Sequence, residues 1–326
     1  MGFKNILITG ASGFLGSHLA EFFLSRGHSV IGVDNFATGL KDNTSYLINK
    51  FKNKYVFINA DVCNDWQAWL GQIQPQLLGE ISHVFHFASP ASPPHYQRLS
   101  VETLWVNSLG LQNAIKFADG VKARVIFSST SEVYGDPAVA PQPESYWGNV
   151  NSFGPRACYD EAKRFGEALI YSWNEKFKKK HGLVRIFNTY GPRMNPDDGR
   201  VIINFLVQGI KGTDLTIYGD GTQTRSFCYV DDLVAGIICY ANSDLIEPVN
   251  FGNDKEFTVQ ELAEKVQAIF SDKNIQIKYL EKAKDDPTKR RPDLSKARRN
   301  FPEWGPKVQL DEGLKKTLEW LKTTTL

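Results

Sequence analysis

The chain has 326 residues, of which 42% are hydrophobic and 23% are charged, as is usual for a globular protein of about two domains. Its 38 basic and 36 acidic residues leave a net charge of +2, which excludes the strongly basic footprint of a nucleic-acid-binding domain. No apolar run approaches the roughly 20 residues that a membrane-spanning helix needs.

The start of the chain and its cysteines predict a cytoplasmic protein. Met1 to Asn5 lead directly into an apolar run, without the pattern of a secretory signal peptide. The four cysteines show no paired C-x-x-C spacing, which is typical of reduced thiols in the cytosol. The six histidines show no metal-ligand spacing, so no metal site is predicted.

The first half of the chain alternates short apolar runs with amphipathic stretches, a pattern typical of a doubly wound parallel α/β sheet. Continuously apolar strands are expected where helices cover both faces of the sheet. Strands are predicted at 3–9, 29–34, 55–60, 82–87, 122–128 and 182–188, with helices at 14–26, 64–78, 98–118 and 156–180.

A glycine-rich turn containing Gly10, Gly13 and Gly16 joins the first predicted strand to the first helix. Such glycines let the backbone approach a pyrophosphate, and the helix N-terminus offers free N–H groups. The spacing is GxxGxxG rather than GxGxxG, which is a weak signal by itself, and a tight turn without a ligand is the alternative. Asp34 ends the second strand, where a carboxylate binds adenosine ribose hydroxyls and repels a 2′-phosphate.

The residues after Asp34 decide between the two nicotinamide cofactors. Asn35 and Phe36 follow with no arginine to accept a 2′-phosphate, so NAD is predicted rather than NADP. Asp61 and Val62, after the third strand, would flank the adenine, although an ordinary loop explains them equally well.

Hydroxyl and carboxylate side chains close the fifth predicted strand in the run Ser128-Ser129-Thr130-Ser131-Glu132. Ligands bind at this carboxyl edge in doubly wound sheets. We expect Thr130 to hydrogen-bond both the reacting hydroxyl of the substrate and Tyr159. Glu132 would point a carboxylate into a sugar-binding site, with a surface-loop acid as the alternative.

Tyr159 and Lys163 form a Y-x-x-x-K pair on the helix predicted at 156–180. Residues four apart lie on one helical face, so the ammonium is expected to lower the pKa of the phenol from its usual value near ~10. The pair could then take a proton from a sugar or steroid hydroxyl while a nicotinamide takes the hydride.

The regular alternation ends near residue 188, where glycine and proline become frequent. We therefore predict an NAD-binding domain at 1–188, to which 226–250 returns, and a smaller α/β substrate-binding lid at 189–225 and 251–326. A terminal amphipathic helix is predicted at 310–322. Arg193, Arg200, Arg225 and the run 289–291 resemble anion clamps, although a basic run is more often a solvated face.

Longer motifs give a more specific indication than these short patterns. The strings STSEVYGDP, GPRACYDEAKR and DDPTKRRPDLSKA are the most specific, and ITGASGFLGSHL, VDNFATG, FASPASPPHY, YWGNVN, RIFNTYGPRM, DDGRV and YGDGTQTRSF support them. Through these motifs the chain resembles, nearly end to end, the extended short-chain dehydrogenase/reductases and, within them, the UDP-glucuronate decarboxylases (UDP-xylose synthases).

This resemblance implies a Rossmann fold, bound NAD and decarboxylation of UDP-glucuronate to UDP-xylose through a transient 4-keto sugar. It implies catalytic roles for Tyr159, Lys163 and Thr130, with Glu132 and Arg290 beside the departing carboxylate. Further cofactor contacts are implied at Phe14, Leu15, Thr38, Gly39, Phe87, Ser89 and Ser128. Further substrate contacts are implied at Asn188, Arg200, Tyr218 and Arg225, and relatives pair as homodimers through the helices that match 98–118 and 156–180.

Other reaction types remain as alternatives. A 4,6-dehydratase needs an acid to protonate its leaving hydroxide, and Ser131 stands where those enzymes carry an aspartate. A 4-epimerase, a 4-dehydrogenase and a non-catalytic NAD-sensing protein are the other candidates. Trp105-Val106 replaces the Lys-Thr that is common in the decarboxylases and approaches substrate and cofactor there, which leaves the exact sugar open.

Overall fold

The structure is a computed structural model that describes residues 2–281 and 289–324, apart from the side chain of Lys289. Within these residues a central parallel sheet contains seven strands in the order β11-β6-β5-β4-β1-β2-β3. The strands are β1 (Asn5–Thr9), β2 (Val30–Asp34), β3 (Tyr55–Asn59), β4 (Ile81–His86), β5 (Arg124–Thr130), β6 (Gly182–Ile186) and β11 (Val249–Phe251). This sheet confirms the predicted doubly wound α/β fold.

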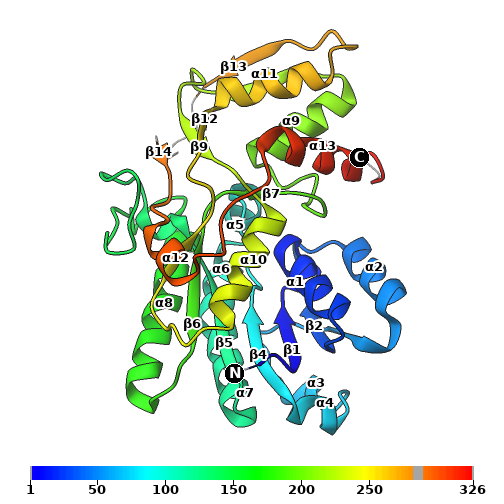
Figure 1. Cartoon of the computed structure of the whole chain (residues 1–326), viewed down its shortest axis with the longest axis vertical. Coiled ribbons are helices and arrows are strands. Elements are labelled where there is room, and N and C mark those ends of the chain that lie inside the picture. The colour runs from blue at the N-terminus through cyan, green and yellow to red at the C-terminus, as the bar shows by residue number, and fades with distance from the viewer. Residues whose placement is uncertain (1, 282–288, 325–326) are drawn as a thin grey trace.

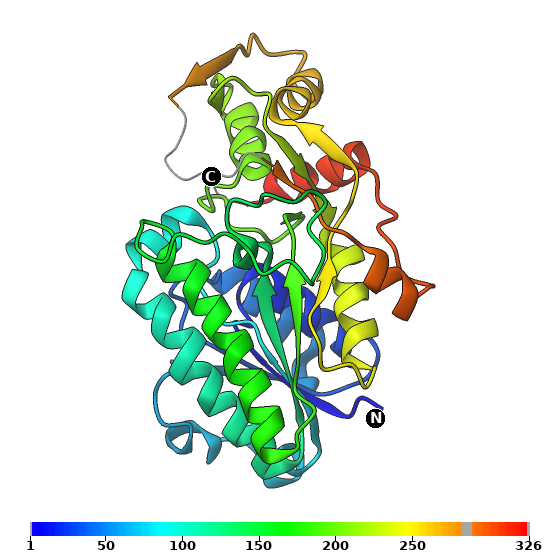
Figure 2. The ribbon, with the colours of Figure 1, turned by 90° about the vertical axis from the view of Figure 1, so that its left-hand side faces the viewer.

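Helices cover both faces of the sheet (Figures 1 and 2). On one face lie α1 (Phe14–Ser25), α2 (Lys41–Phe51) and α10 (Val230–Ala241), and on the other lie α7 (Leu111–Val121) and α8 (Ala157–Phe177). This double cover explains why β2 is buried along its whole length and why its sequence, Val-Ile-Gly-Val-Asp, is almost entirely apolar. Shorter elements are η1 (Lys52–Lys54), α3 (Gln67–Leu70), α4 (Pro75–Gly79), α5 (Pro93–Arg98), α6 (Ser100–Trp105), η2 (Val106–Gly110), η3 (Ser131–Tyr134) and α12 (Ser295–Asn300).

Three predicted helices differ from the structure. The helix predicted at 64–78 is wrong: only the short α3 and α4 form there, because Pro75 lacks a backbone N–H and starts a new helix. The helix predicted at 98–118 is divided into α6, the π-helical turn η2 and α7. Helix α8 ends at Phe177 rather than 180, because Lys178 adopts a left-handed conformation with φ of 50°.

The remaining elements form an upper layer over the carboxyl ends of the strands (Figure 1). Strands β9 (Thr224–Ser226), β12 (Glu256–Thr258) and β14 (Lys289–Arg290) make one small sheet, and β8 (Leu215–Tyr218) pairs with β13 (Ile277–Leu280). Helices α9 (Val201–Lys211), α11 (Val259–Ile269) and α13 (Leu310–Leu321) pack around them. Strands β7 (Thr189–Tyr190) and β10 (Cys228–Tyr229) pair where this layer meets the main sheet.

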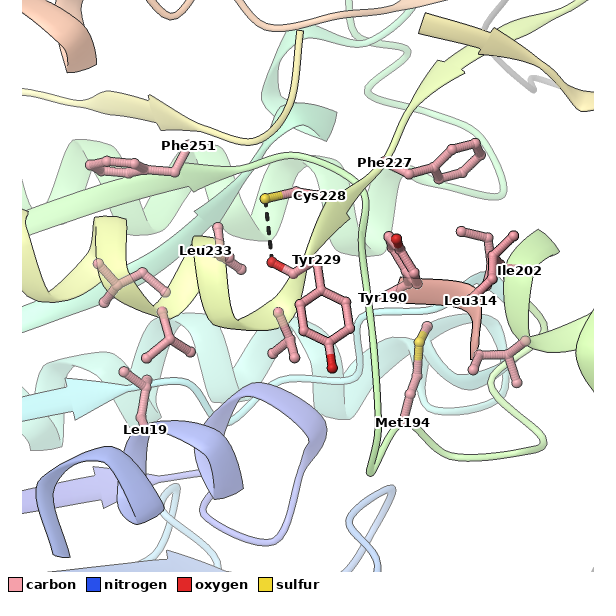
Figure 3. Close-up of a cluster of buried hydrophobic side chains, with 14 of the residues drawn as sticks. Leu19, Tyr190, Met194, Ile202, Phe227, Cys228, Tyr229, Leu233, Phe251 and Leu314 are labelled. Atoms are coloured by element: carbon pink, nitrogen blue, oxygen red, sulfur yellow. Dashed lines mark hydrogen bonds between the residues drawn. The ribbon is translucent and has the colours of Figure 1, made fainter. Parts of the chain in front are cut away.

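One hydrophobic core joins the upper layer to the main sheet. Leu19 of α1 and Leu233 of α10 belong to the same buried cluster as Ile202 of α9 and Leu314 of α13. Tyr190 lies between the two groups in Figure 3. The cleft between the layers is therefore lined from both sides by parts of one packed unit.

The order of the strands fixes where a ligand site lies. Connections run outward from β1 through β2 to β3 on one side and from β4 through β5 to β6 on the other. A crevice forms at the carboxyl ends of β1 and β4, where this direction reverses. Gly10 follows β1 and Phe87 follows β4, so both lie at this crevice.

Candidate active site

A cleft of about 680 Å³ opens at the crevice between the main sheet and the upper layer. The glycine turn lies on one side of it, the ends of β5 and α8 form its centre, and α9, β9 and β14 close the other side. The predicted site residues that line it are Gly10, Gly13, Phe14, Leu15, Gly16, Thr38, Phe87, Ser89, Ser128, Thr130, Glu132, Tyr159, Lys163, Asn188, Arg200, Tyr218, Arg225 and Arg290.

The glycine turn has a shape that side chains would destroy. Gly10 has φ of 72°, and a Cβ there would lie 2.7 Å from the backbone of Phe87. A Cβ on Gly16 would lie 2.0 Å from the carbonyl oxygen of Gly10. Gly13 caps α1 without a side-chain hydrogen bond, so the first N–H groups of the helix face the cleft. This bare turn at a helix N-terminus fits the pyrophosphate of a dinucleotide.

Asp34 lies directly beneath this turn. Its carboxylate accepts hydrogen bonds from the backbone N–H of Ser12 at 2.9 Å and of Phe36 at 2.7 Å. Burial raises the pKa of Asp34, and the backbone donors oppose that shift. The carboxylate therefore orders the glycine turn and the loop after β2, and its predicted contact with ribose hydroxyls remains a prediction.

The other residues predicted near the adenosine lie beside Asp34. The Asn35 side chain donates to Asp61 at 3.1 Å, which ties the ends of β2 and β3 together. Phe36 and Gly39, with Thr38, line a second cavity of about 410 Å³ adjoining the cleft. Asp34, Asn35, Asp61 and Val62 are not among the residues that line either cavity.

Tyr159 lies at the centre of the cleft, near the end of β5. Its phenol hydrogen-bonds Thr130, as predicted. Its ring stacks on the ring of Tyr96, with centroids 5.0 Å apart and planes 7° apart. The hydroxyl that the sequence placed with the phenol is therefore present, and Tyr96 fixes the orientation of the ring.

Lys163 is directed toward the carboxyl end of β5 and also lies near the Tyr159 ring. Lys163 Nζ donates to the carbonyl oxygen of Ser128 at 2.7 Å and lies 5.7 Å from the centre of the Tyr159 ring. Burial raises the pKa of Tyr159, while the Thr130 hydrogen bond and the charges of Arg200 and Arg156 lower it. Burial lowers the pKa of Lys163 to about 7. The ammonium is turned toward the strand end, and the effect of Lys163 on the pKa of the phenol stays a prediction.

Glu132 lies in the cleft between two arginines. One carboxylate oxygen accepts from Arg290 and the other from Arg156. Charged side chains are seldom buried unless paired, and here the buried Arg290 and the mostly covered Glu132 and Arg156 form one charged cluster. Glu132 is thus a site residue and not a surface-loop acid.

The predicted anion-binding arginines divide into two groups. Arg200 and Arg225 line the far end of the cleft, where Arg200 Nη2 also donates to Asp198 at 2.8 Å. Arg193 is bound to α1 instead: its guanidinium donates to Glu21 and to His18, each at 2.7 Å. That ion pair holds α1 against the loop after β7, and because Arg193 also lines the cleft, its role as an anion clamp stays a prediction.

The residues of the basic run at 289–291 also have different surroundings. Arg290 points into the cleft, whereas Arg291 donates to Glu256 at 3.3 Å on the upper layer. The side chain of Lys289 and residues 285–288 of the DDPTKRRPDLSKA motif lie outside the described residues.

The departure at Trp105 and Val106 does not reach either cavity. Trp105 ends α6 with 52% of its surface exposed, and Val106 begins the π-helical turn. Neither residue lines the cleft. The following residue, Asn107, is buried and donates to Ser89 at 2.9 Å. Trp105 therefore changes the exposed face of the helix, Val106 packs against the hydrophobic core, and the contact between Asn107 and Ser89 is present.

Sequence reasoning missed Arg156 and Tyr96. Both lie within quoted motifs, GPRACYDEAKR and FASPASPPHY, and Arg156 precedes Tyr159 by three residues. The one-turn spacing places Arg156 on the same side of α8 as Tyr159, which was the available signal. Tyr96 gave no signal, because its stacking on Tyr159 depends on the docking of α5 against α8.

Among the described residues, no group of three or more His, Cys, Asp or Glu side chains could hold a metal ion. Across the same residues, no helix is both long and apolar enough to cross a membrane.

Comparison with known proteins gives a consistent result. Residues 6–252 match the NAD dependent epimerase/dehydratase family. UDP-glucuronic acid decarboxylase 1 of Danio rerio is 44% identical over 317 residues, which cover 97% of this chain and 72% of the relative. UDP-glucuronic acid decarboxylase 1 of Arabidopsis thaliana is 46% identical over 310 residues, which cover 95% of this chain and 68% of that relative.

Solved structures show the same arrangement at lower identity. The UDP-glucose 4-epimerase of Thermotoga maritima, with UDP-glucose, is 28% identical with a TM-score of 0.86, covering 98% of both chains. The UDP-glucuronic acid 4-epimerase of Bacillus cereus, with UDP-glucuronic acid and NAD, is 28% identical with a TM-score of 0.83. That match covers 98% of this chain and 99% of the epimerase.

Proposed function

The chain belongs to the NAD dependent epimerase/dehydratase family, and we infer that it decarboxylates UDP-glucuronate to UDP-xylose with NAD as a recycled cofactor. The decarboxylases of Danio rerio and Arabidopsis thaliana support the substrate and the reaction. The observation that carries the inference is Glu132 held between two arginines at the cleft, beside the phenol of Tyr159. A uronate brings a carboxylate, and this cluster offers guanidinium donors to bind it.

The residues at the strand end start the reaction. Tyr159, oriented by its hydrogen bond to Thr130 and by the Tyr96 ring, would take the proton from the C4 hydroxyl of the sugar. NAD supplies the acceptor for the C4 hydride and returns that hydride at the end of the turnover. Lys163, bound to the Ser128 carbonyl, would position the cofactor at this strand end.

The charged cluster would act in the second stage. With a ketone at C4 the sugar is a β-keto acid, so the bond between C5 and the carboxylate carbon can break and leave its electron pair in an enolate. Carbon dioxide leaves as a neutral molecule, which requires no acid at the position of Ser131. Protonation at C5 and return of the hydride to C4 then give UDP-xylose. Arg290 and Glu132 would hold the carboxylate until it leaves.

The UDP portion of the substrate would lie against the upper layer. Asn188, Arg200, Tyr218 and Arg225 line that end of the cleft, and the two arginines offer planar donors that suit a diphosphate. At the opposite end, the glycine turn and Asp34 would hold the adenosine half of the cofactor. The nicotinamide and the sugar would then meet near Tyr159.

A homodimer is proposed for the assembled protein. Helices α6 and α8 pack against each other and run side by side in Figure 2. Helix α6, the turn η2 that follows it and helix α8 expose large apolar side chains, and a second copy placed on them would bury this surface. These side chains are Val101, Leu104, Trp105, Leu109, Phe165 and Tyr171. We also propose a cytoplasmic location, which the four free cysteines support.

The test is to incubate purified protein with UDP-glucuronate and no added NAD. Release of carbon dioxide with formation of UDP-xylose is the expected result. The second candidate, a UDP-glucuronate 4-epimerase, is favoured by the structural similarity to the Bacillus cereus enzyme. It would form UDP-galacturonate without carbon dioxide, and that outcome would overturn the decarboxylase assignment.

A further inference from the structure

The two arginines around Glu132 come from different parts of the chain. Arg156 immediately precedes α8, one helical turn before Tyr159. Arg290 lies on β14 of the upper layer, opposite Arg225 of β9 in the strand register. Each takes a different oxygen of the Glu132 carboxylate. Glu132 is therefore held from the catalytic helix on one side and from the upper layer on the other.

The surroundings of the two guanidinium groups also differ. Arg156 is fixed from behind, with Nε 4.0 Å from a carboxylate oxygen of Asp160 and its guanidinium 5.9 Å from the centre of the Tyr96 ring. Arg290 has a buried Nη2 that finds no hydrogen-bond partner among the described residues. Arg290 therefore has a donor left for a further acceptor in the cleft, and Arg156 is committed to its present neighbours.

We propose that Arg156 is the positioning residue that keeps Glu132 ionised and in place when Arg290 binds the carboxylate of the substrate. The proposal rests on the assigned function, because it requires a substrate that carries a carboxylate.

Charge balance gives the physical reason. A uronate carboxylate entering beside Glu132 would put two anions within a few ångströms of each other, and like charges at that distance favour protonation of one of them. Arg290 alone would have to neutralise both. With Arg156 held on Glu132, two cations face two anions and both carboxylates can remain ionised. Removing Arg156 would make Glu132 take up a proton at a higher pH.

Other titratable groups around the cluster fit this arrangement. Tyr159, Asp160 and Cys158 face it from α8, Tyr96 from α5, and Arg200 from the start of α9. Burial raises the pKa of Asp160 to about 7, with Arg156 opposing the shift. Because Asp160 is partly protonated near neutral pH, it competes only weakly with Glu132 for Arg156.

The experiment is Arg156→Gln, assayed as a pH profile of carbon dioxide release from UDP-glucuronate. We expect the acidic limb of kcat to move to higher pH by about 1–3 units, the range by which an adjacent opposite charge shifts a carboxylate. KM for UDP-glucuronate should change less than about twofold, since Arg290 still binds the substrate carboxylate. Arg156→Lys retains the charge and should keep the limb near that of the unmodified protein.

Two comparisons make the result specific to Glu132. In a Glu132→Gln background position 132 no longer titrates, so adding Arg156→Gln should move the limb no further, whereas a shift that arises from Asp160 would persist. Arg298→Gln serves as the matched control, because Arg298 is an exposed arginine paired with Asp254 at 2.8 Å on the surface. Its profile should be unchanged.

Several outcomes would contradict the proposed role of Arg156. A raised KM with an unmoved limb would make Arg156 a substrate-binding residue and overturn the proposal. An equal shift in the Glu132→Gln background would do the same. If Arg156→Gln does not fold, Arg156→Met takes its place in the same pH profile: an acidic limb moved to higher pH at nearly constant KM, and restored by Arg156→Lys, supports the proposal, and a raised KM with an unmoved limb refutes it. If the unmodified protein releases no carbon dioxide from UDP-glucuronate, the assigned function fails as well.

Discussion

Burial acts in opposite directions on Tyr159 and Lys163: it raises the pKa of the phenol and lowers the pKa of the ammonium to about 7. A helical spacing of four residues was expected to bring their charges together. The lysine instead donates to the carbonyl of Ser128. The influences that favour the phenolate come from Thr130, Arg200 and Arg156, so the base depends on residues from three separate segments.

Replacing the phenol tests this arrangement directly. Tyr159→Phe keeps the ring that stacks on Tyr96 and removes the proton acceptor, so turnover should fall by about 10²–10⁴-fold. The amount of NAD that remains bound to the purified protein should not change. Tyr171→Phe, an exposed tyrosine on the same helix, is the matched control. Near-normal turnover of Tyr159→Phe would remove Tyr159 from its assigned role.

Lys163 gives a prediction about stability. Its pKa is 10.5 in the unfolded chain and about 7 in the folded protein, so the folded state binds this proton more weakly. The contribution of Lys163 to the free energy of unfolding is therefore full above about pH 10.5 and is lost as the pH falls to about 7. Lys163→Met should lack this loss, which denaturant unfolding across that pH range would measure. The exposed Lys116→Met serves as a control, and equal pH dependence in all three proteins would contradict the buried position of Lys163.

The close contact between the start of α1 and the turn after β1 leaves no room for a side chain at Gly16. Gly16 lies in the first turn of α1, and a Cβ there would meet the carbonyl oxygen of Gly10 at 2.0 Å. Gly16→Ala should therefore lower the free energy of unfolding by about 1–3 kcal/mol, as overpacking typically does, and weaken NAD binding. Thermal unfolding with and without NAD measures both effects.

Gly120→Ala is the matched control for Gly16→Ala. Gly120 lies in α7, and a Cβ there would meet nothing within 4 Å. Alanine favours a helix over glycine by up to about 1 kcal/mol, so this variant should be as stable as the unmodified protein or slightly more stable. Equal behaviour of the two variants would show that the turn is not constrained by contact with Gly10.

Elements with a strong periodic pattern could be predicted from the sequence, and those that depend on tertiary contacts could not. All six predicted strands are present, because their apolar runs reflect burial between two helical layers. Within the segment predicted as one helix at 64–78, Trp66, Trp69 and Ile73 recur at helical spacing. These side chains are buried, but Gly71 and Pro75 interrupt the backbone between them.

The same division holds for the active site. Residues within recognisable motifs, such as Thr130 and Glu132, lie where the sequence placed them. The partners of Glu132 and the direction of the Lys163 side chain depend on the docking of α8 against β5 and of β14 against β9. Helical spacing indicates that Arg156 lies on the same side of α8 as Tyr159, but no local pattern shows that Arg156 pairs with Glu132 or that Arg193 pairs with Glu21.

At the scale of the whole molecule, the exposed face of α6 and α8 gives a prediction about assembly. Trp105→Glu would place a charge in the centre of the proposed dimer interface, so we expect a shift from dimer to monomer in sedimentation velocity. Tyr279→Glu, at an exposed aromatic on β13 of the upper layer, is the control and should leave the dimer intact. A monomeric unmodified protein, or a dimer that survives Trp105→Glu, would contradict this interface.

The pairing of β14 with β9 has a consequence for how the two ends of a substrate communicate. Arg290 and Arg225 are neighbours in register on adjacent strands and both line the cleft. Under the proposed function Arg290 would bind the sugar carboxylate and Arg225 the diphosphate, so a shift of one strand on binding would be transmitted to the other. Binding of free UDP at Arg225 should therefore help to order Arg290 at the position of the sugar carboxylate. A substrate that lacks this carboxylate should in turn make a weaker diphosphate contact at Arg225.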